Sequence, residues 1–368
     1  MNKNILILVN HEIVIYNFRR ELVEELLKAG YNVYISSPKG EKIEYFKKIG
    51  CIFEEIQIDR HGINPFKDLK IINIYKRLIK KIHPVVILTY TIKPNLYGAI
   101  AAKKNNIPVI ANITGLGTAV ENGGLLQKIT IILYKIAFTK IKKVFFQNKE
   151  NMNFFKSKNI AIDRHKLLPG SGVNLEYFQP ILYPKSDIIE FVFISRIMKQ
   201  KGIDQYLEAA KYIRKKYPNT RFHICGFCEE EYEKILNEYQ NKGIIIYHGL
   251  VNDIREILKY IHCTIHPTYY PEGMSNVLLE SCACARPIIT TNRSGCREIV
   301  DNNINGYVVR QKSTEDLIEK IEMFLNLTYS EKKEMGLAAR KKVEKQFDKN
   351  IIVKEYMDLI NQIESEAN

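Results

Sequence analysis

The stretch from residue 267 to residue 300 constrains the fold of this 368-residue chain more than any other. Its Pro-Glu-Gly turn at 271–273 cannot continue a helix, whereas apolar residues recur at helical spacing from Met274 to Ala285. Pro287 ends this helix, and the β-branched run 288–291 follows as a short strand. A helix that leads directly into a buried strand is typical of a parallel α/β sheet.

Two carboxylates lie eight residues apart in this stretch, Glu272 in the turn and Glu280 within the helix. At 1.5 Å per residue they are roughly 12 Å apart along the helix axis, which is the span from hexose to ribose in a nucleotide-sugar. The free N–H groups between them would face a diphosphate; they belong to Gly273, Met274, Ser275 and Asn276. The spacing leaves an alternative open, in which Glu272 only caps the helix and Glu280 pairs with an arginine.

Length and composition indicate a globular protein of two domains. A chain of 368 residues is long for one hydrophobic core, and no run of about 18 uncharged apolar residues exists to span a membrane. The first residues are typical of a strand rather than of a secretory signal, so we expect a cytosolic protein. Seven scattered cysteines argue against a disulfide framework, and Cys225 and Cys228 lack the further ligands that a zinc site needs.

The excess of positive charge lies entirely in the N-terminal half. Residues 1–180 hold 28 Lys and Arg against 14 Asp and Glu, whereas residues 181–368 hold 27 of each class. A basic half implies an acidic partner. Nucleic acid is one candidate, although no recognisable nucleic-acid-binding module occurs; an anionic membrane surface is the other.

Strands and helices alternate along both halves, as they do in Rossmann-like domains. In the first half we expect strands at 5–9, 33–36, 85–90, 109–113 and 144–147, and helices at 16–29, 66–82, 96–105 and 125–143. In the second half we expect further strands at 190–194, 222–225, 244–247 and 263–266, and helices at 317–325, 330–346 and 350–363. The Pro-rich stretch 180–184 is expected to be the linker.

The predicted helix at 125–143 is apolar over most of its circumference. Lys128, Lys135 and Lys142 are seven residues apart and would form one narrow stripe along it. A broad apolar face flanked by lysines suits a helix that lies in a membrane interface. It also suits a buried helix with one solvated edge, and the sequence leaves both interpretations open.

Segments that follow the predicted strands are candidates for ligand contact, because the carboxyl ends of parallel strands line the crevice of an α/β sheet. In the first half these candidates are His11, Lys93, Thr114 and Gly115. Arg60 lies in a turn-rich segment, where its planar guanidinium could bind a phosphate. Each of these residues could instead be an ordinary solvated loop residue.

The E-x7-E motif from Glu272 to Glu280, followed by A-R-P-I-I-T-T and G-C-R-E-I-V, resembles the donor site of the family-four retaining glycosyltransferases. The similarity extends from Asn4 to about Asp358, and the motifs occur in the family's order. It implies an α/β protein with the GT-B fold, in which two Rossmann-like domains face each other across a cleft. The chain departs from the family at Ala285, where relatives often have Gly, and at Thr114, where many have His.

The resemblance also implies roles for the domains and residues. It assigns acceptor binding to residues 1–175, nucleotide-sugar binding to residues 185–348, and a helix that crosses back to the first domain to residues 349–368. Glu272, Arg196 and Lys201 would be catalytic, the two cations neutralising the leaving diphosphate. No D-x-D motif occurs, so neither a metal nor another cofactor is expected. Donor contacts are assigned to Glu280, residues 273–276, Gly226, Val251 and Gly172.

The segments around Arg60, Lys93 and Thr114 resemble those of enzymes that add N-acetylhexosamine to polyprenyl-diphosphate-linked saccharides. The implied partners are a UDP-sugar with GalNAc as first choice, the lipid-linked saccharide, and the anionic inner face of the cell membrane, without nucleic acid. Three alternatives remain: a transferase with a soluble acceptor, a UDP-sugar epimerase of the same fold, and a basic nucleic-acid-binding protein.

Overall fold

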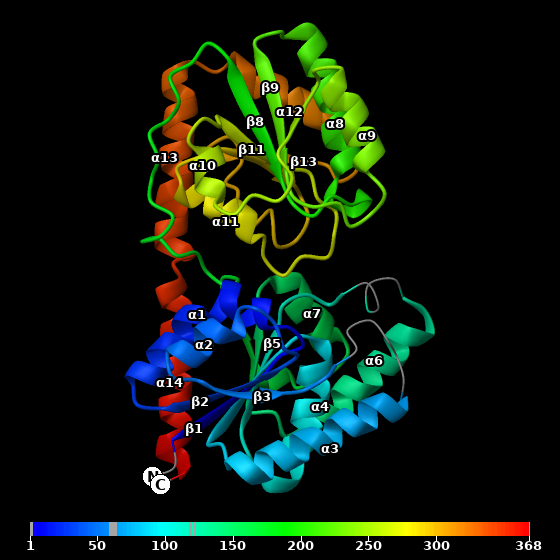
Figure 1. Cartoon of the computed structure of the whole chain (residues 1–368). Helices are drawn as coiled ribbons and strands as arrows, with labels where there is room; N and C mark the ends of the chain where they lie inside the picture. Colours follow the sequence, from blue (N-terminus) through cyan, green and yellow to red (C-terminus); the bar gives the residue numbers. More distant parts are fainter. Residues whose placement is uncertain (1–2, 59–64, 118–119, 121–122, 368) are drawn as a thin grey trace. The chain divides into compact units, whose positions relative to one another are not determined.

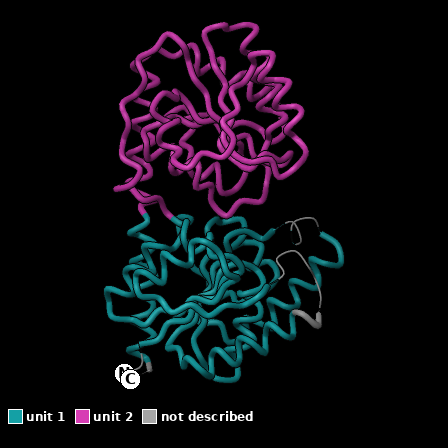
Figure 2. The backbone as a smooth tube through the Cα atoms, viewed as in Figure 1, with its two compact units in different colours: residues 1–171, 349–368 teal, residues 172–348 magenta. Residues whose placement is uncertain are grey.

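The computed structural model describes residues 3–58, 65–117, 120 and 123–367, and these residues form two compact units. The first unit comprises Met1–Ser171 and Lys349–Asn368, and the second comprises Gly172–Asp348 (Figure 2). Each unit is a parallel sheet covered by helices, which confirms the predicted α/β class. The final helix, α14 (Lys349–Ala367), belongs to the first unit, so the chain returns to its starting domain.

The stretch 180–184, expected to be a linker, is instead part of the second unit. The buried guanidinium of Arg286 donates hydrogen bonds to the carbonyl oxygens of Ile181 and Leu182 at 2.9 and 3.0 Å. The hydroxyl of Tyr183 donates to the carbonyl of His262 at 3.0 Å. These contacts bind the Pro-rich segment to the second unit, so the boundary lies after Ser171.

The first unit contains a seven-stranded sheet with the order β3-β2-β1-β4-β5-β6-β7. Figure 1 labels β1, β2, β3 and β5 of this sheet. The strands are β1 (Asn4–Leu8), β2 (Asn32–Ser37), β3 (Ile52–Glu55), β4 (Val86–Tyr90), β5 (Val109–Ile113), β6 (Lys143–Phe146) and β7 (His165–Leu167). The sequence did not predict β3 or β7. Both are short edge strands with few buried side chains, so they lack the apolar runs by which the inner strands are recognised.

Helices cover both faces of this sheet. They are α1 (Glu12–Lys28), α2 (Ile43–Lys48), α3 (Pro65–Ile82), α4 (Ile92–Ala102), α6 (Gly124–Ala137), α7 (Lys149–Ser157) and α14. One apolar cluster contains side chains of α3, α4 and α6, among them Tyr75 and Tyr134. The other joins α1 to α14 through Ile15, Leu22 and Tyr356. The last helix therefore completes one of the two cores of the first unit.

Helix α6 ends six residues before the predicted end at residue 143, because Phe138 and Ile141 turn into the core. A 3₁₀ turn follows, η2 (Phe138–Lys140), and Lys142 lies beyond it, where it forms an ion pair with Glu366. The predicted stripe of three lysines is therefore wrong for Lys142. The outer face of α6 is apolar and exposed, and its residues are Leu125, Ile129, Ile132 and Ile136.

The second unit contains a six-stranded parallel sheet with the order β10-β9-β8-β11-β12-β13. Its strands are β8 (Ile189–Ile194), β9 (Thr220–Cys225), β10 (Ile246–Tyr247), β11 (Cys263–His266), β12 (Ile288–Thr291) and β13 (Gly306–Val309). Its helices are α8 (Ile203–Lys216), α9 (Glu233–Asn241), α10 (Ile254–Leu258), α11 (Asn276–Ala283), α12 (Thr314–Asn326) and α13 (Tyr329–Gln346). None of the described helices of either unit is long and apolar enough to cross a membrane.

Helix α11 is shorter than the predicted helix from Met274 to Ala285. Met274 and Ser275 belong to the preceding loop, and Ser275 caps the helix without a side-chain hydrogen bond. At the other end, Ala285 has a φ of 59°, in the left-handed region that favours glycine. The chain therefore accommodates alanine where relatives often have glycine, at the cost of backbone strain.

Candidate active site

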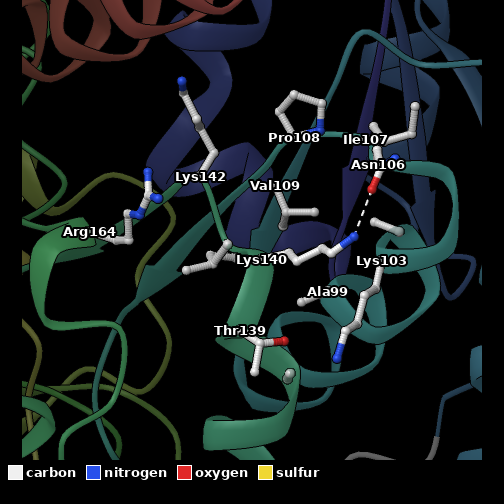
Figure 3. A pocket seen from close by; sticks show the side chains of 13 residues that line it. Ala99, Lys103, Asn106, Ile107, Pro108, Val109, Thr139, Lys140, Lys142 and Arg164 are labelled. Atoms are coloured by element: carbon white, nitrogen blue, oxygen red, sulfur yellow. Dashed lines mark hydrogen bonds between the residues drawn. The ribbon is translucent and has the colours of Figure 1, made fainter.

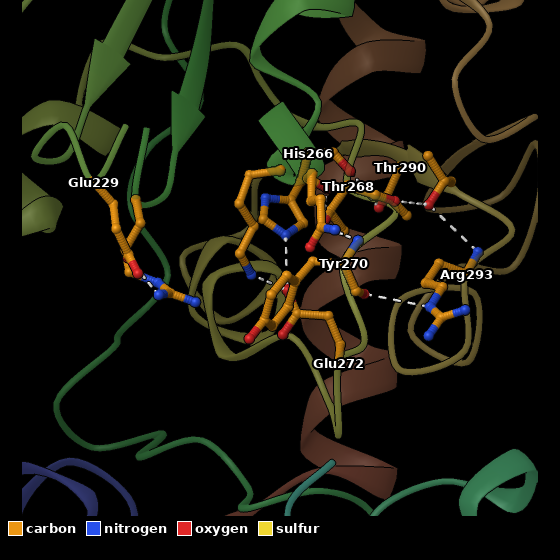
Figure 4. Close-up of polar contacts among 11 residues, drawn as sticks. Glu229, His266, Thr268, Tyr270, Glu272, Thr290 and Arg293 are labelled. Atoms are coloured by element: carbon orange, nitrogen blue, oxygen red, sulfur yellow. Dashed lines mark hydrogen bonds and ion pairs between the residues drawn. The ribbon is translucent and has the colours of Figure 1, made fainter. Parts of the chain in front are cut away.

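A cluster of charged and aromatic side chains lies beyond the carboxyl ends of β8, β11 and β12 (Figure 4). Arg196 follows β8, and the loop after β11 carries Tyr270 and Glu272. Lys201 closes the 3₁₀ turn η4 (Lys199–Lys201) before α8. Neighbouring parallel strands end at the same edge of the sheet, so segments distant in sequence meet here.

Lys201 and Glu272 form a largely buried ion pair, with side chains 8% and 16% exposed. Nε2 of His266 lies 3.7 Å from the same carboxylate oxygen, which is longer than a hydrogen bond. Burial by itself would raise the pKa of Glu272, but the nearby Lys201 and the contact with His266 outweigh burial and lower it to about 2. Glu272 is therefore ionised at neutral pH, and two predicted catalytic residues contact each other.

Arg196 is held differently from Lys201. It forms an ion pair with Glu229, and its guanidinium lies 5.4 Å from the ring centroid of Tyr270. The ammonium of Lys201 lies 4.6 Å from the centroid of the same ring, so both cations contact one aromatic side chain. The sequence did not single out Tyr270 or Glu229, because neither stands in a motif that identifies its contacts.

His266 is the last residue of β11 and is almost fully buried. Burial lowers its pKa, and neither ring nitrogen has a hydrogen-bond partner among the described residues. The carbonyl oxygen of His266 accepts a hydrogen bond from the hydroxyl of Thr290 on β12 at 2.7 Å (Figure 4). The imidazole is therefore neutral at pH 7, and its Nε2 lies 3.7 Å from the carboxylate of Glu272.

A second loop, after β12, supports the backbone around Glu272. Gly295 has a φ of 90°, and a Cβ there would come within 2.8 Å of the carbonyl oxygen of Gly273. The amide of Ser275 donates to the carbonyl of Gly295 at 2.8 Å. Arg293 Nε donates to the carbonyl of Tyr270 at 3.3 Å, so two contacts fix this loop. Gly295 belongs to the Gly-Cys-Arg-Glu motif noted in the sequence, but the sequence analysis predicted no role for the residues of this loop.

Glu280 lies on α11 and is half-buried. No cation pairs with its carboxylate among the described residues, and burial raises its pKa to about 7. The alternative in which Glu280 pairs with an arginine is therefore wrong for the described residues. A carboxylate held without a cation favours a partner that offers neutral donors, such as hydroxyl groups.

The remaining candidates of the second unit lie in loops that contact one another. Gly226 has a φ of 144°, and a Cβ there would come within 1.7 Å of the carbonyl oxygen of Ser195. Its amide donates to the carbonyl of Gly249 at 2.7 Å, two residues before Val251. Gly172, with a φ of 73°, precedes Val173, which shares an apolar cluster with Met274. The loops after β8, β9 and β10 are thus joined through backbone contacts.

The candidates of the first unit follow the neighbouring strands β1, β4 and β5. The ring of His11 caps α1 by accepting from the amide of Ile13 at 3.2 Å. Lys93, on α4, forms an ion pair with Asp68 at 3.1 Å. Thr114 and Gly115 directly follow β5, and Arg60 lies outside the described residues. The described candidates therefore follow strands that end at the same edge of the sheet.

The described residues include no group of three or more His, Cys, Asp or Glu side chains that could hold a metal ion. The groups at this site that can bind an anion are Arg196, Lys201 and the backbone amides at the start of α11, whose cap Ser275 makes no side-chain bond. Such a set of groups can bind a diphosphate and can stabilise the charge that develops on it as it leaves.

Comparisons with known proteins concern the family and the fold of the chain. Residues 4–148 match the model of the glycosyl transferase 4-like family, and residues 178–342 match that of the glycosyl transferases group 1. An N,N'-diacetylbacillosaminyl-diphospho-undecaprenol alpha-1,3-N-acetylgalactosaminyltransferase of Campylobacter jejuni is 27% identical and aligns over 95% of this chain and 96% of its own.

A UDP-Gal:alpha-D-GlcNAc-diphosphoundecaprenol alpha-1,3-galactosyltransferase of Escherichia coli is also 27% identical, over 71% of each chain. Among solved structures, an Anabaena protein in complex with UDP superposes with a TM-score of 0.78 at 14% identity, over 98% of this chain and 100% of its own. At 14% identity, this similarity to the Anabaena protein shows the fold alone.

Proposed function

Because this chain belongs to the group 1 glycosyltransferases, with two Rossmann-like units, we propose that it transfers a sugar from a UDP-sugar to a polyprenyl-diphosphate-linked saccharide. The lipid-linked acceptors in the names of the two bacterial relatives support this choice of acceptor. The full-length similarity to an N-acetylgalactosaminyltransferase supports GalNAc as the donor sugar. The product would be a lipid-linked intermediate of a surface polysaccharide or glycan.

The buried Lys201–Glu272 pair at the start of α11 is the observation that carries this proposal. The UDP diphosphate would bind Arg196, Lys201 and the backbone amides of the first turn of α11. Glu280, which has no cation partner among the described residues, would bind the ribose hydroxyls. The hexose would then lie next to Glu272, at the end of the donor opposite to the ribose.

The reaction would retain the configuration at the anomeric carbon. UDP would leave as the C–O bond to the diphosphate breaks, and the acceptor hydroxyl would attack the same face of the sugar. The ionised Glu272 would favour positive charge at the anomeric carbon, while Lys201 and Arg196 would neutralise negative charge on UDP. These cations and the start of α11 would make a divalent metal unnecessary.

We also propose that the first unit binds an anionic membrane through α6. Leu125, Ile129, Ile132 and Ile136 are 44–74% exposed, and Lys128 and Lys135 are exposed on the same helix. Aliphatic side chains with flanking lysines suit the boundary between lipid head groups and acyl chains. A lipid-linked acceptor requires this surface, which would place the enzyme on the inner face of the cell membrane.

A panel of UDP-sugars tests the proposal through UDP release, measured with and without lipid-diphosphate-linked saccharides. We expect release above background hydrolysis only when a UDP-N-acetylhexosamine and a lipid-linked acceptor are both present, and no loss of activity in EDTA. Equal turnover with a soluble saccharide would contradict the lipid-linked acceptor. Loss of activity in EDTA, restored by Mg²⁺ or Mn²⁺, would contradict the metal-free diphosphate site.

A further inference from the structure

A cavity of about 380 Å³ lies in the first unit, away from the candidate residues described above (Figure 3). It is formed where β5 and β6 begin, since Pro108 and Val109 line it on one side and Ile141 and Lys142 on another. Thr114 and Gly115 follow the other end of β5, about 16 Å away along a five-residue strand. The cavity therefore lies at the amino ends of the strands, and the acceptor candidates lie at their carboxyl ends.

Four cations line this cavity: Lys103, Lys140, Lys142 and Arg164. Figure 3 shows Lys142 and Arg164 on one side of it and Lys103 and Lys140 on the other. None of the thirteen lining residues, all within the described part of the chain, is acidic. The cavity is thus a concentration of positive charge inside a unit that already carries the chain's excess of basic residues.

The charge of these cations is only partly compensated. Lys142 forms an ion pair with Glu366 of α14, and Arg164 helps to lower the pKa of the same exposed carboxylate, after Lys142 and Gln362. Within the described part of the chain, Lys140 contacts only a neutral group, the amide oxygen of Asn106, at 2.9 Å. Lys103 and Arg164 form no ion pair with any described carboxylate. An anion that enters the cavity would therefore meet cations whose charge is still available.

The floor of the cavity is apolar and consists of small or aliphatic side chains. Ala99, Ala102 and Ala137 leave the space open, and Ile107 and Val109 line it. Its volume is within the range of small-molecule sites and exceeds what a single inorganic phosphate needs. An apolar floor with cations on two sides suits a phosphate ester, in which one part of the ligand is charged and the other is organic.

The position of the cavity indicates the source of that ester. Ala137, the last residue of α6, and Thr139, which follows it, both line the cavity. Ile136, the last of the exposed aliphatic residues of α6, precedes them directly. A membrane that touched the apolar face of α6 would therefore hold its head groups close to this cavity.

We propose that this cavity binds the phosphate of an anionic membrane lipid head group, as a site separate from the donor and acceptor sites. The proposal rests on the proposed membrane contact of α6 for the source of the phosphate, and it does not depend on transferase activity. Lys103, Lys140, Lys142 and Arg164 would bind the phosphate oxygens, and the apolar floor would receive the glycerol part. The lipid would hold the first unit at a fixed orientation on the membrane.

Binding of a short-chain phosphatidylglycerol below its critical micelle concentration tests this site without a bilayer, a donor or an acceptor. We expect saturable binding by isothermal titration calorimetry to the intact wild-type protein. Lys103→Gln combined with Arg164→Gln should weaken binding by about tenfold or more, since charge-assisted hydrogen bonds are lost. Thr139→Phe should also weaken it, because it obstructs the cavity and keeps all four cations.

A matched control carries Lys47→Gln and Lys48→Gln, two exposed residues at the end of α2 that remove the same charge elsewhere in the first unit. This control should bind the lipid as the wild type does. An equal loss in the control would overturn the proposal in favour of diffuse attraction. Equally tight binding of inorganic phosphate would overturn the lipid as the source of the ligand.

Vesicle sedimentation separates this inference from the function on which it rests. If substitutions on α6 leave binding to phosphatidylglycerol vesicles unchanged while the cavity still binds the soluble lipid, the α6 contact fails and the cavity site stands. If the wild type sediments with these vesicles through α6 but gives no heat with the soluble lipid, the cavity site fails and the membrane contact stands.

Discussion

The two units share an architecture but use charge in different ways. In the second unit the site cations have anionic partners of their own, Lys201 with Glu272 and Arg196 with Glu229, and positive and negative residues are balanced over residues 181–368. In the first unit the basic excess is left exposed, at α6 and around the cavity at the start of β5. This difference is what we expect if the second unit binds one small ligand and the first unit binds a large anionic surface, as proposed above.

The largest expected effect comes from breaking the buried pair in the second unit. Lys201→Ala leaves the carboxylate of Glu272 buried without its cation and removes a charge that would stabilise departing UDP. We expect kcat/KM to fall by about 10²–10³-fold and the free energy of unfolding to fall by about 3–5 kcal/mol. UDP-release kinetics and urea unfolding measure the two effects.

The control for this variant removes both charges. Lys201→Met combined with Glu272→Gln should recover much of the stability, because no buried charge is left unpaired, and should recover none of the activity. Glu272→Gln alone should lower mainly kcat, since its charge matters most when the anomeric carbon becomes positive. Activity in the double variant would contradict the catalytic roles of the pair.

Glu280 should affect donor binding rather than turnover. Glu280→Gln removes an acceptor for the ribose hydroxyls, so we expect UDP to bind about tenfold to a hundredfold more weakly. Glu272→Gln should leave UDP affinity unchanged, because UDP lacks the hexose. Calorimetric titration of UDP compares the two variants, and the reverse order of effects would mean that the donor lies along α11 in the opposite direction.

The same two carboxylates should respond to pH in opposite senses. The pKa of Glu272 is lowered from 4.5 to about 2, so its contribution to stability is present above pH 4.5 and is lost as the pH falls towards 2. The pKa of Glu280 is raised from 4.5 to about 7, so stability should fall as the pH rises through this interval. Urea unfolding at several pH values checks this, and Glu280→Gln should abolish the decrease between pH 4.5 and 7.

In the first unit, substitutions on the exposed face of α6 should act on membrane binding alone. Ile132→Glu combined with Ile136→Glu should weaken sedimentation with anionic vesicles by about tenfold or more, because two side chains lose their apolar contact with lipid. Binding of UDP should not change, since these residues lie outside the second unit. Unchanged sedimentation would place the membrane contact elsewhere on the first unit.

The smallest expected effect concerns Ala285, the residue after the cap of α11. Its φ of 59° is strained for alanine, and glycine adopts this conformation without a steric cost. Loss of the buried methyl group partly offsets this gain. We therefore expect Ala285→Gly to change the free energy of unfolding by less than about 1 kcal/mol, measured by urea unfolding, and to leave the function of both units unchanged.

Much of the framework was predictable because it follows from local patterns. The strand at 109–113 has the predicted bounds, since five buried residues, four of them apolar, lie between turn signals. The exposed edge strands β3 and β7 and the early end of α6 were missed because they depend on neighbours. Phe138 continues the helical pattern in sequence, but it packs into the core and the chain turns.

For the candidate site, the sequence predicted residues but not the contacts between them. The spacing of the motif identified Glu272 and Glu280, and the loop after β8 identified Arg196 and Lys201. The pairing of Lys201 with Glu272, 71 residues apart, follows from the order β8-β11 in the sheet, which no local period encodes. Tyr270, which both cations contact, has no signal in the sequence beyond its aromatic ring.

The return of α14 to the first unit has a consequence for how the protein is made. Ile352, Tyr356 and Ile360 belong to the core beneath α1, and Tyr356 accepts a hydrogen bond from the buried Asn112 at 2.8 Å. A ribosome delivers these residues only after the whole second unit has been synthesised. The second unit can therefore fold while the first still exposes apolar surface. The unit whose synthesis starts first is thus the last to be completed.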